Sequence, residues 1–191
     1  MKPPLQIAFL TGQSNPGNAA LSPLQNTFLD ALPVPDEWKV RVNFPYPDIP
    51  QTFRRTRLPI ASWNNLALYL RSRLPAFAAT YRFPVLAQIE RAERTLLLAG
   101  SSGLELLFNL HLPAAALSRL HVFAYGPVAR RLPDCDCRLV QGRDSISRLF
   151  FRGDVPTTRV ECDHLDYLRD SQVLALCVAY LNEIKAAGGT G

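Results

Sequence analysis

The chain has 191 residues, of which 48% are hydrophobic and 19% are charged, with a formal net charge of +5. A chain of this size and composition buries one substantial core, so we expect a single domain over residues 1–185 and a flexible tail over 186–191. Its spread of apolar residues and modest net charge exclude disorder for most of the chain. Because no apolar run approaches the roughly 20 residues that cross a bilayer, we expect a cytoplasmic protein without a membrane span.

The positive charge comes almost entirely from arginine, with 18 Arg and 3 Lys. These arginines are scattered in small groups and are not gathered into one block with interleaved aromatic residues, which argues against nucleic acid as a partner. One group, Arg54, Arg55 and Arg57, is a candidate for attracting an acidic substrate or partner. The composition identifies no protein partner.

Short apolar runs alternate with longer amphipathic stretches along the chain. The pattern predicts strands at residues 5–12, 39–46, 95–100, 120–126, 138–142 and 157–162. It predicts helices between and after them, at residues 21–31, 60–74, 84–92, 103–111 and 165–187. Several strands are apolar at nearly every position, as burial on both faces of a parallel sheet requires. The expected fold class is α/β, with an open, mostly parallel sheet of about six strands and helices on both faces.

Ligands of an open parallel sheet bind beyond the carboxyl ends of its strands, so chemistry is expected where each strand ends. The first strand is followed by Thr11-Gly12-Gln13-Ser14-Asn15-Pro16-Gly17. This spacing is neither the Gly-x-Gly-x-x-Gly of dinucleotide sites nor the Gly-Lys-Ser/Thr of a phosphate loop. A turn rich in Gly, Asn and Pro accounts for these residues, and the segment predicts no nucleotide cofactor.

The third predicted strand ends in Ala99-Gly100-Ser101-Ser102-Gly103. Ser101 comes directly after the apolar strand and before a helix, with small residues two positions away on either side. A turn of this kind holds its central residue in a strained backbone and lifts the side chain beside the free N–H groups of the helix. Ser101 is therefore a candidate nucleophile, although a Ser-Ser-Gly turn that merely caps a helix explains the same residues.

A serine nucleophile needs a histidine as its base and a carboxylate that orients the base. Of the three histidines, only His164 follows the end of a predicted strand. Asp144 follows the end of the preceding predicted strand, so Ser101, Asp144 and His164 are expected to meet at one edge of the sheet. Three neighbouring carboxylates remain alternative acids: Asp154, Asp163 and Asp166.

In the order of these motifs the sequence resembles the α/β-hydrolase superfamily, in particular the small lidless serine hydrolases of the retinoblastoma-binding-protein-9 kind. Residues 99–103 are similar to the nucleophile elbow, residues 142–146 to the acid loop and residues 163–165 to the base loop. The resemblance implies an oxyanion loop at residues 11–13, in which the backbone N–H of Gln13 acts together with that of Ser102. The chain departs from the family pattern at three positions: Gly100, where His is common, Asp144, one residue closer to its glycine, and Asp163, where Gly often precedes the base.

The function implied by this resemblance is that of a serine hydrolase that cleaves a small-molecule ester or thioester through an acyl-enzyme on Ser101. It implies no metal and no organic cofactor. Gly12 and Trp63 are expected to contribute to substrate binding, and the aromatic residues Phe53, Trp63 and Tyr69 form either an apolar wall of the pocket or part of the core. The alternative is a hydrolase-like fold that serves as a binding or regulatory module without catalysis.

The cysteines offer a metal site as a competing interpretation. Cys135, Cys137, Cys162 and His164 would supply three thiolates and an imidazole to a tetrahedral zinc ion. Structural zinc sites usually separate paired cysteines by two to four residues, whereas one residue separates Cys135 from Cys137. We therefore expect four reduced thiols that behave as small apolar side chains.

Overall fold

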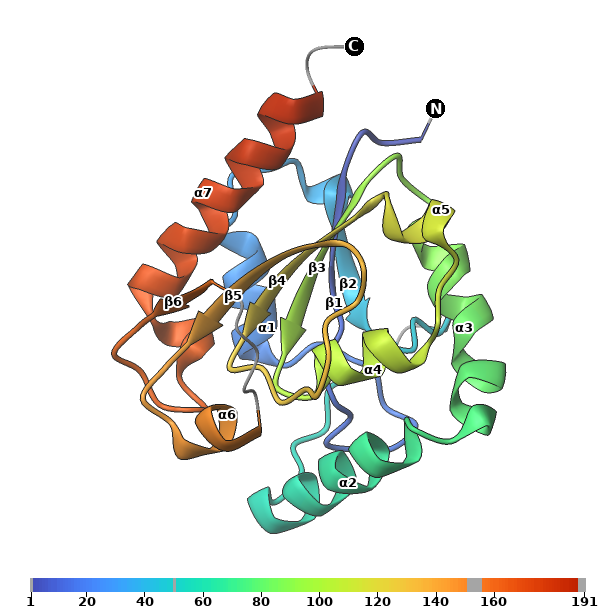
Figure 1. The fold of residues 1–191 in the computed structure, drawn as a ribbon, viewed down its shortest axis with the longest axis vertical. Helices are drawn as coiled ribbons and strands as arrows, with labels where there is room; N and C mark the ends of the chain where they lie inside the picture. Colours follow the sequence, from blue (N-terminus) through green and yellow to red (C-terminus); the bar gives the residue numbers. More distant parts are fainter. Residues whose placement is uncertain (1, 50, 151–155, 189–191) are drawn as a thin grey trace.

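The computed structural model describes residues 2–49, 51–150 and 156–188, and its centre is a six-stranded parallel sheet in the order β2-β1-β3-β4-β5-β6 (Figure 1). The strands are β1 (Gln6–Phe9), β2 (Lys39–Asn43), β3 (Thr95–Gly100), β4 (Leu120–Tyr125), β5 (Asp136–Gln141) and β6 (Thr157–Arg159). Each lies within or overlaps a predicted strand, and β3 has the predicted bounds. The predicted α/β fold with an open parallel sheet is confirmed.

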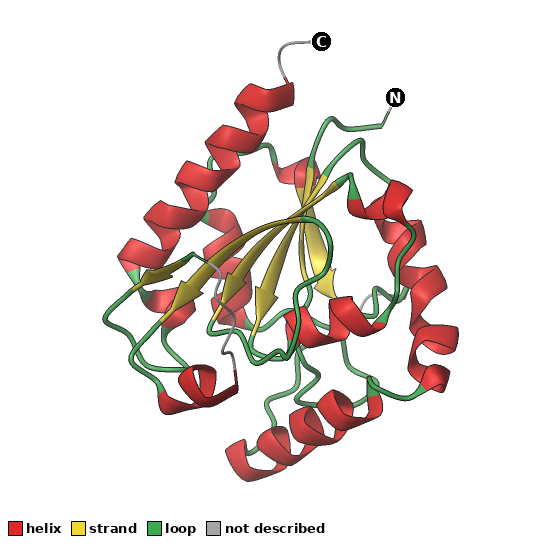
Figure 2. Ribbon diagram, viewed as in Figure 1, coloured by secondary structure: helices red, strands yellow, loops and turns green. Residues whose placement is uncertain are grey.

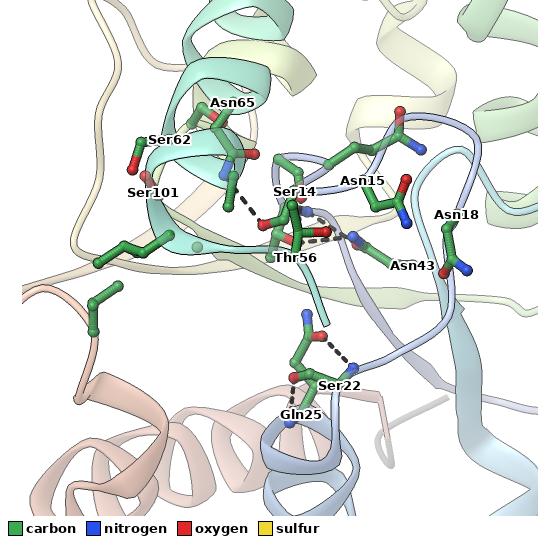
Figure 3. A pocket seen from close by; sticks show the side chains of 18 of the residues that line it. Ser14, Asn15, Asn18, Ser22, Gln25, Asn43, Thr56, Ser62, Asn65 and Ser101 are labelled. Atoms are coloured by element: carbon green, nitrogen blue, oxygen red, sulfur yellow. Dashed lines mark hydrogen bonds between the residues drawn. The ribbon is translucent and has the colours of Figure 1, made fainter. Parts of the chain in front are cut away.

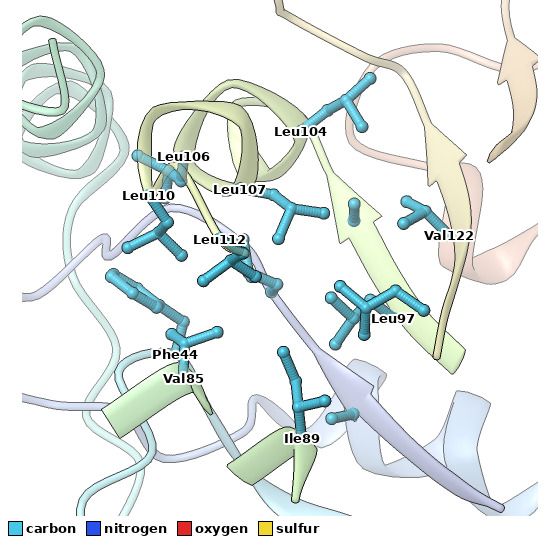
Figure 4. Packing of buried hydrophobic residues seen from close by; sticks show 14 of the residues in the cluster. Phe44, Val85, Ile89, Leu97, Leu104, Leu106, Leu107, Leu110, Leu112 and Val122 are labelled. Atoms are coloured by element: carbon cyan, nitrogen blue, oxygen red, sulfur yellow. The ribbon is translucent and has the colours of Figure 1, made fainter. Parts of the chain in front are cut away.

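Each face of the sheet has its own hydrophobic core, because successive side chains of a strand point to opposite faces. Ala8 and Leu97 face the core that is covered by helices α3, α4 and α5, whereas Ile7 and Leu96 face the core that is covered by α1 and α7. Figure 2 shows the three layers, and Figure 4 shows the first of these cores in detail. The covering helices are α1 (Pro23–Asp30), α3 (Pro75–Ile89), α4 (Gly103–Asn109), α5 (Ala114–Leu117) and α7 (Ser171–Gly188).

The order of the strands places a crevice between β1 and β3. From β1 the chain passes through α1 to β2 on one side, whereas from β3 it passes through α4 and α5 to β4 on the other side. The loops that follow β1 and β3 therefore diverge toward opposite faces of the sheet. Divergence of this kind marks where open α/β sheets bind their ligands.

Helix α3 begins at Pro75 and not at Pro84, where the sequence pattern placed the start of a helix over residues 84–92. Pro84 lies inside the helix. An interior proline costs about 3 kcal/mol in an exposed helix. Burial of Phe77, Val85 and Ile89 against the sheet offsets this cost, so the helix continues through the proline.

The helix predicted over residues 165–187 is divided into two elements, a short 3-10 helix η2 (Tyr167–Arg169) and α7. Asp170 causes this division, because its carboxylate accepts hydrogen bonds from the N–H groups of Gln172 and Val173 and so caps α7. Helix α7 continues through Gly188, so the expected flexible tail is helical over its first three residues. Residues 189–191 lie outside the described part of the chain.

The remaining helices are α2 (Leu58–Arg71), α6 (Ser145–Phe150) and the 3-10 helix η1 (Asp36–Trp38). Helix α2 corresponds to the helix predicted over residues 60–74, whereas α5, α6 and η1 were not predicted. In the described ranges, no helix combines the length and the apolar character that a membrane span needs.

Candidate active site

Ser101 lies in the turn between β3 and α4 with a φ of 51°, in the left-handed region that residues other than glycine rarely adopt. Its N–H donates to the carbonyl oxygen of Tyr125 at 3.2 Å, and its carbonyl oxygen accepts from the N–H of Val128 at 2.9 Å. These two hydrogen bonds tie the turn to the last residue of β4 and to the chain that follows this strand. They hold the strained backbone in place at the carboxyl edge of the sheet.

Two glycines beside Ser101 allow neighbouring chain segments to approach the turn closely. A Cβ atom at Gly103 would lie 1.9 Å from the backbone carbonyl oxygen of Leu10, and one at Gly100 would lie 2.5 Å from the ring of Tyr125. The first contact explains why the pattern needs a small residue two positions after Ser101. The second explains the glycine that stands where the hydrolase family commonly has histidine.

His164 connects Ser101 to Asp144. Its Nε2 lies 3.2 Å from Oγ of Ser101, and its Nδ1 lies 3.0 Å from Oδ1 of Asp144. The three side chains proposed from the sequence are thus connected by two successive hydrogen bonds, from the hydroxyl of Ser101 to the imidazole of His164 and from there to the carboxylate of Asp144. Of the other histidines, His111 is exposed beyond the end of α4, and His121 pairs with Asp136.

Asp144 is buried, and both of its carboxylate oxygens are occupied by hydrogen-bond donors. Oδ1 also accepts the N–H of Ser147 at 2.7 Å, while Oδ2 accepts the hydroxyls of Ser147 at 2.8 Å and Tyr167 at 2.7 Å. Burial raises the pKa of Asp144, but the hydrogen bonds from Ser147 and Tyr167, together with His164, outweigh it and leave the pKa below its usual value. The ionised carboxylate can therefore hold a proton on Nδ1 of His164 and leave Nε2 free to accept one.

Of the three alternative acids, two do not contact the imidazole of His164, and the third lies outside the described residues. Asp166 pairs with Arg169 at 2.9 Å, Asp163 is exposed, and Asp154 falls in the part of the chain that is not described. Asp144 is thus the carboxylate that contacts the imidazole among the described residues.

Ser147 and Tyr167 were missed by the sequence analysis. Asp144 directly precedes α6 (Ser145–Phe150) and accepts the N–H of the third helical residue, Ser147. An aspartate at the N-cap is a local sequence signal, so the role of Ser147 could have been found. Tyr167 has no such local signal, because it lies 23 residues from Asp144 along the chain.

A cavity of about 580 Å³ opens beside Ser101 and His164, a size typical of small-molecule sites. It is lined by the loop after β1, by residues 53–56 and by one face of α2. Much of the lining consists of amide and hydroxyl side chains, which Figure 3 shows around the cavity: Ser14, Asn15, Asn18, Ser22, Gln25, Asn43, Thr56, Ser62 and Asn65. No carboxylate is present among the described lining residues, whereas Arg54 and Arg55 both line the cavity.

Gly12 and Gln13 line this cavity next to Ser102. A Cβ atom at Gly12 would lie 2.3 Å from Oδ1 of Asn65 and 2.9 Å from Oγ of Ser102, and both of these buried atoms lack a hydrogen-bond partner within the described chain. The backbone N–H groups of Gln13 and Ser102 likewise have no acceptor among the described residues. Several polar groups beside Ser101 are therefore available to a ligand.

Trp63 does not line the cavity, contrary to the expectation that it binds substrate; its side chain is 70% exposed. Helix α2 turns Ser62, Asn65 and Tyr69 toward the cavity, and at 3.6 residues per turn Trp63 lies on a different side of the helix. Of the other aromatic residues considered, Phe53 and Tyr69 both line the cavity.

All four cysteines carry free thiols in this structure. The Sγ atoms of Cys135 and Cys137 lie 3.8 Å apart, as two side chains on the same side of an extended segment can, while Cys162 and Cys177 are buried. Over the described residues, no group of three or more His, Cys, Asp or Glu side chains is arranged to hold a metal ion.

No protein-family model matches the chain, and comparison with curated proteins finds no match. The resemblance to α/β hydrolases therefore depends on the order of the motifs and on the geometry at Ser101. The structure establishes the coarser assignment, an α/β fold with a parallel six-stranded sheet.

Proposed function

We propose that the protein is a serine hydrolase that cleaves an ester or thioester of a small acyl substrate. The observation that carries the proposal is the chain of contacts from a serine in a strained turn to an imidazole at 3.2 Å, and from the imidazole to a carboxylate at 3.0 Å. Nucleophilic catalysis by a hydroxyl requires this sequence of groups within hydrogen-bond reach.

In the proposed mechanism, Oγ of Ser101 attacks the carbonyl carbon of the substrate while Nε2 of His164 accepts the hydroxyl proton. The N–H groups of Gln13 and Ser102 donate hydrogen bonds to the oxyanion that forms, and Asp144 stabilises the imidazolium. When this intermediate collapses, His164 gives its proton to the departing alcohol or thiol, which leaves the acyl group on Ser101. Water, deprotonated by His164, then attacks the acyl carbon. When this second intermediate collapses, His164 returns the proton to Oγ of Ser101 and the carboxylic acid leaves.

The cavity supports an acyl substrate with both apolar and polar parts. Phe53, Leu58 and Leu66 provide apolar lining near the β1 loop and α2. The unpartnered oxygen atoms of Asn65 and Ser102 lie on the same cavity and suit a polar group close to the scissile bond.

The proposal is tested by labelling with a fluorophosphonate probe. The wild-type protein should be labelled at Ser101, and Ser101→Ala should remain unlabelled and lose several powers of ten in kcat. The matched control is Ser118→Ala, because it removes an exposed serine hydroxyl after α5 that does not line the cavity. It should be labelled and should retain most of its kcat.

A panel of acyl esters and thioesters of increasing chain length then defines the substrate. Equal labelling of the wild type and Ser101→Ala would contradict the assignment of the nucleophile. A folded wild type that reacts with neither the probe nor the panel would instead support the alternative, a binding or regulatory module.

A further inference from the structure

The outward face of α2 is apolar, whereas surface helices normally turn polar residues to solvent. Ile60, Trp63 and Leu70 recur at helical spacing along this face and are 52%, 70% and 51% exposed. The buried residues of the helix, Ala61 and Tyr69, lie on its other side. Figure 1 shows α2 at the lower edge of the molecule, beyond the carboxyl ends of the strands.

These side chains belong to a concentration of exposed apolar residues in one part of the chain. Eleven large apolar side chains are exposed in the described residues, and nine of them fall within residues 49–83: Ile49, Phe53, Leu58, Ile60, Trp63, Leu66, Leu70, Leu74 and Phe83. Five of the nine lie on the single helix α2: Leu58, Ile60, Trp63, Leu66 and Leu70. Several large apolar side chains exposed on one helix differ from the single, scattered ones that are normal for soluble proteins.

The same segment carries the excess of positive charge. Residues 49–89 contain six arginines and no Lys, Asp or Glu, so this segment has a formal net charge of +6. The whole chain has a formal net charge of +5, so its remaining residues nearly balance one another. Three arginines, Arg54, Arg55 and Arg57, precede α2, and Arg71 ends it. All four are exposed, and none forms an ion pair with a carboxylate in the described part of the chain. We define the α2 surface as these four arginines with Ile60, Trp63 and Leu70.

We propose that the α2 surface docks the protein on an anionic lipid bilayer, with α2 lying in the plane of the interface. Aliphatic side chains and tryptophan enter the boundary between headgroups and acyl chains, and the arginines at both ends of the helix bind lipid phosphates. The absence of acidic residues from residues 49–89 removes repulsion from an anionic surface.

The charges disfavour a second copy of the chain as the occupant. A two-fold contact would place the same patch on both partners, so the unpaired arginines of one copy would face those of the other. Like charges in that arrangement repel, and the α2 surface has no carboxylate to compensate them. An anionic lipid surface supplies the compensating charge.

Docking would bring the mouth of the cavity to the lipid, because the other face of α2 lines the cavity through Ser62, Asn65 and Tyr69. Acyl substrates would then enter from the bilayer. This consequence rests on the proposed function, whereas the docking itself does not.

The test uses the full chain with phosphatidylcholine vesicles that contain or lack phosphatidylglycerol. The protein has two tryptophans, and Trp38 is partly buried against the core of the α1 and α7 face, so Trp38→Phe leaves Trp63 as the reporter. We expect its emission to shift to shorter wavelength and to be quenched by brominated lipid, with anionic vesicles only. Added salt should weaken this binding.

Variants of the α2 surface separate the apolar from the electrostatic contribution. Cosedimentation should show about tenfold weaker binding for Trp63→Ser and about 30-fold weaker binding for the double variant Arg57→Gln/Arg71→Gln. The matched controls are Leu149→Ser, at a side chain that is 59% exposed, and Arg159→Gln at an exposed arginine; both should bind like the wild type. Because all of these residues are exposed, circular dichroism should show unchanged folding.

Four results would overturn the proposal: no binding to anionic vesicles, equal binding to neutral ones, unchanged binding by the α2 variants, or a stable dimer that Trp63→Ser dissociates. If the protein does not bind anionic vesicles but binds polyglutamate, the surface is assigned to an acidic protein. Ser101→Ala should bind vesicles as the wild type does, so failure of the proposed hydrolase activity and failure of docking are distinguishable.

Discussion

Tyr167 donates a hydrogen bond from its hydroxyl to Oδ2 of Asp144 over 2.7 Å. The same hydroxyl accepts the backbone N–H of Gly142 at 2.6 Å, and the ring lies edge-on to the imidazole of His164. One side chain of η2 therefore connects the end of β5 to the loop after β6. It holds the carboxylate and the imidazole in a defined relationship.

Tyr167→Phe should lower both stability and activity. The change leaves the N–H of Gly142 and one oxygen of Asp144 short of a partner, which we expect to cost about 1–3 kcal/mol in the free energy of unfolding. Freer movement of the carboxylate should reduce kcat by about tenfold. Urea denaturation and steady-state ester hydrolysis measure the two effects.

Tyr46→Phe is the matched control for this variant, because the hydroxyl of Tyr46 is also buried and donates to the carbonyl oxygen of Phe9 at 2.9 Å. It should lose similar stability and keep its kcat. If both variants keep kcat, Tyr167 does not position Asp144 for catalysis.

Asp144→Asn should nearly abolish activity. An amide can donate to Nδ1 of His164, which favours the tautomer with the proton on Nε2 and removes the base from Ser101. We expect kcat to fall by about 10³-fold to 10⁴-fold. Asp166→Asn, which alters only an exposed pair with Arg169, should change kcat little. Similar losses in both variants would remove the special role of Asp144.

Two glycine substitutions should have opposite consequences. In Gly103→Ala the new Cβ meets the backbone carbonyl of Leu10, which cannot move without shifting β1, so the protein should lose about 1–3 kcal/mol in the free energy of unfolding. In Gly12→Ala it meets the side-chain ends of Asn65 and Ser102. These can turn into the cavity, so stability should be largely kept while KM rises. Denaturation and steady-state kinetics test the pair, and a stable Gly103→Ala would contradict the close approach of β1 to α4.

The acid stability of the protein should depend on Glu105, which is fully buried in α4. Burial raises its pKa, but hydrogen bonds from Arg130 and Asn109 outweigh this and leave the pKa below its usual value. Because the folded pKa is the lower one, the stabilisation is complete above the unfolded value of about 4.3 and is lost as the pH falls through the folded pKa.

Glu105→Gln should therefore destabilise the protein by about 3 kcal/mol at neutral pH. The difference from the wild type should shrink below about pH 4, where Glu105 becomes protonated. Glu183→Gln, which breaks an exposed pair with Arg138, should have a small effect at every pH. Chemical denaturation across the acid range measures both variants, and a constant difference for Glu105→Gln would be inconsistent with this ionisation.

Local patterns were sufficient to predict strands and insufficient to predict where helices begin. The bounds of β3 follow from an uninterrupted apolar run that ends at a glycine. For α3, Pro84 was interpreted as a first helical residue, but burial of Phe77 and Val85 carries the helix through it. Helix α6 was not predicted because it is short, although Asp144 stands at its N-cap and accepts the N–H of Ser147.

The sequence by itself determined the parallel α/β architecture and the candidates Ser101 and His164, because apolar periodicity and turn residues are local signals. It proposed Asp144 as the acid but left three other carboxylates open. Only the tertiary structure decided the distances between these three side chains and the outward direction of Trp63. It also decided that Tyr167 completes the hydrogen bonds of Asp144. Each of these features depends on how segments far apart in the chain pack together, and the order of residues along any one segment does not specify that packing.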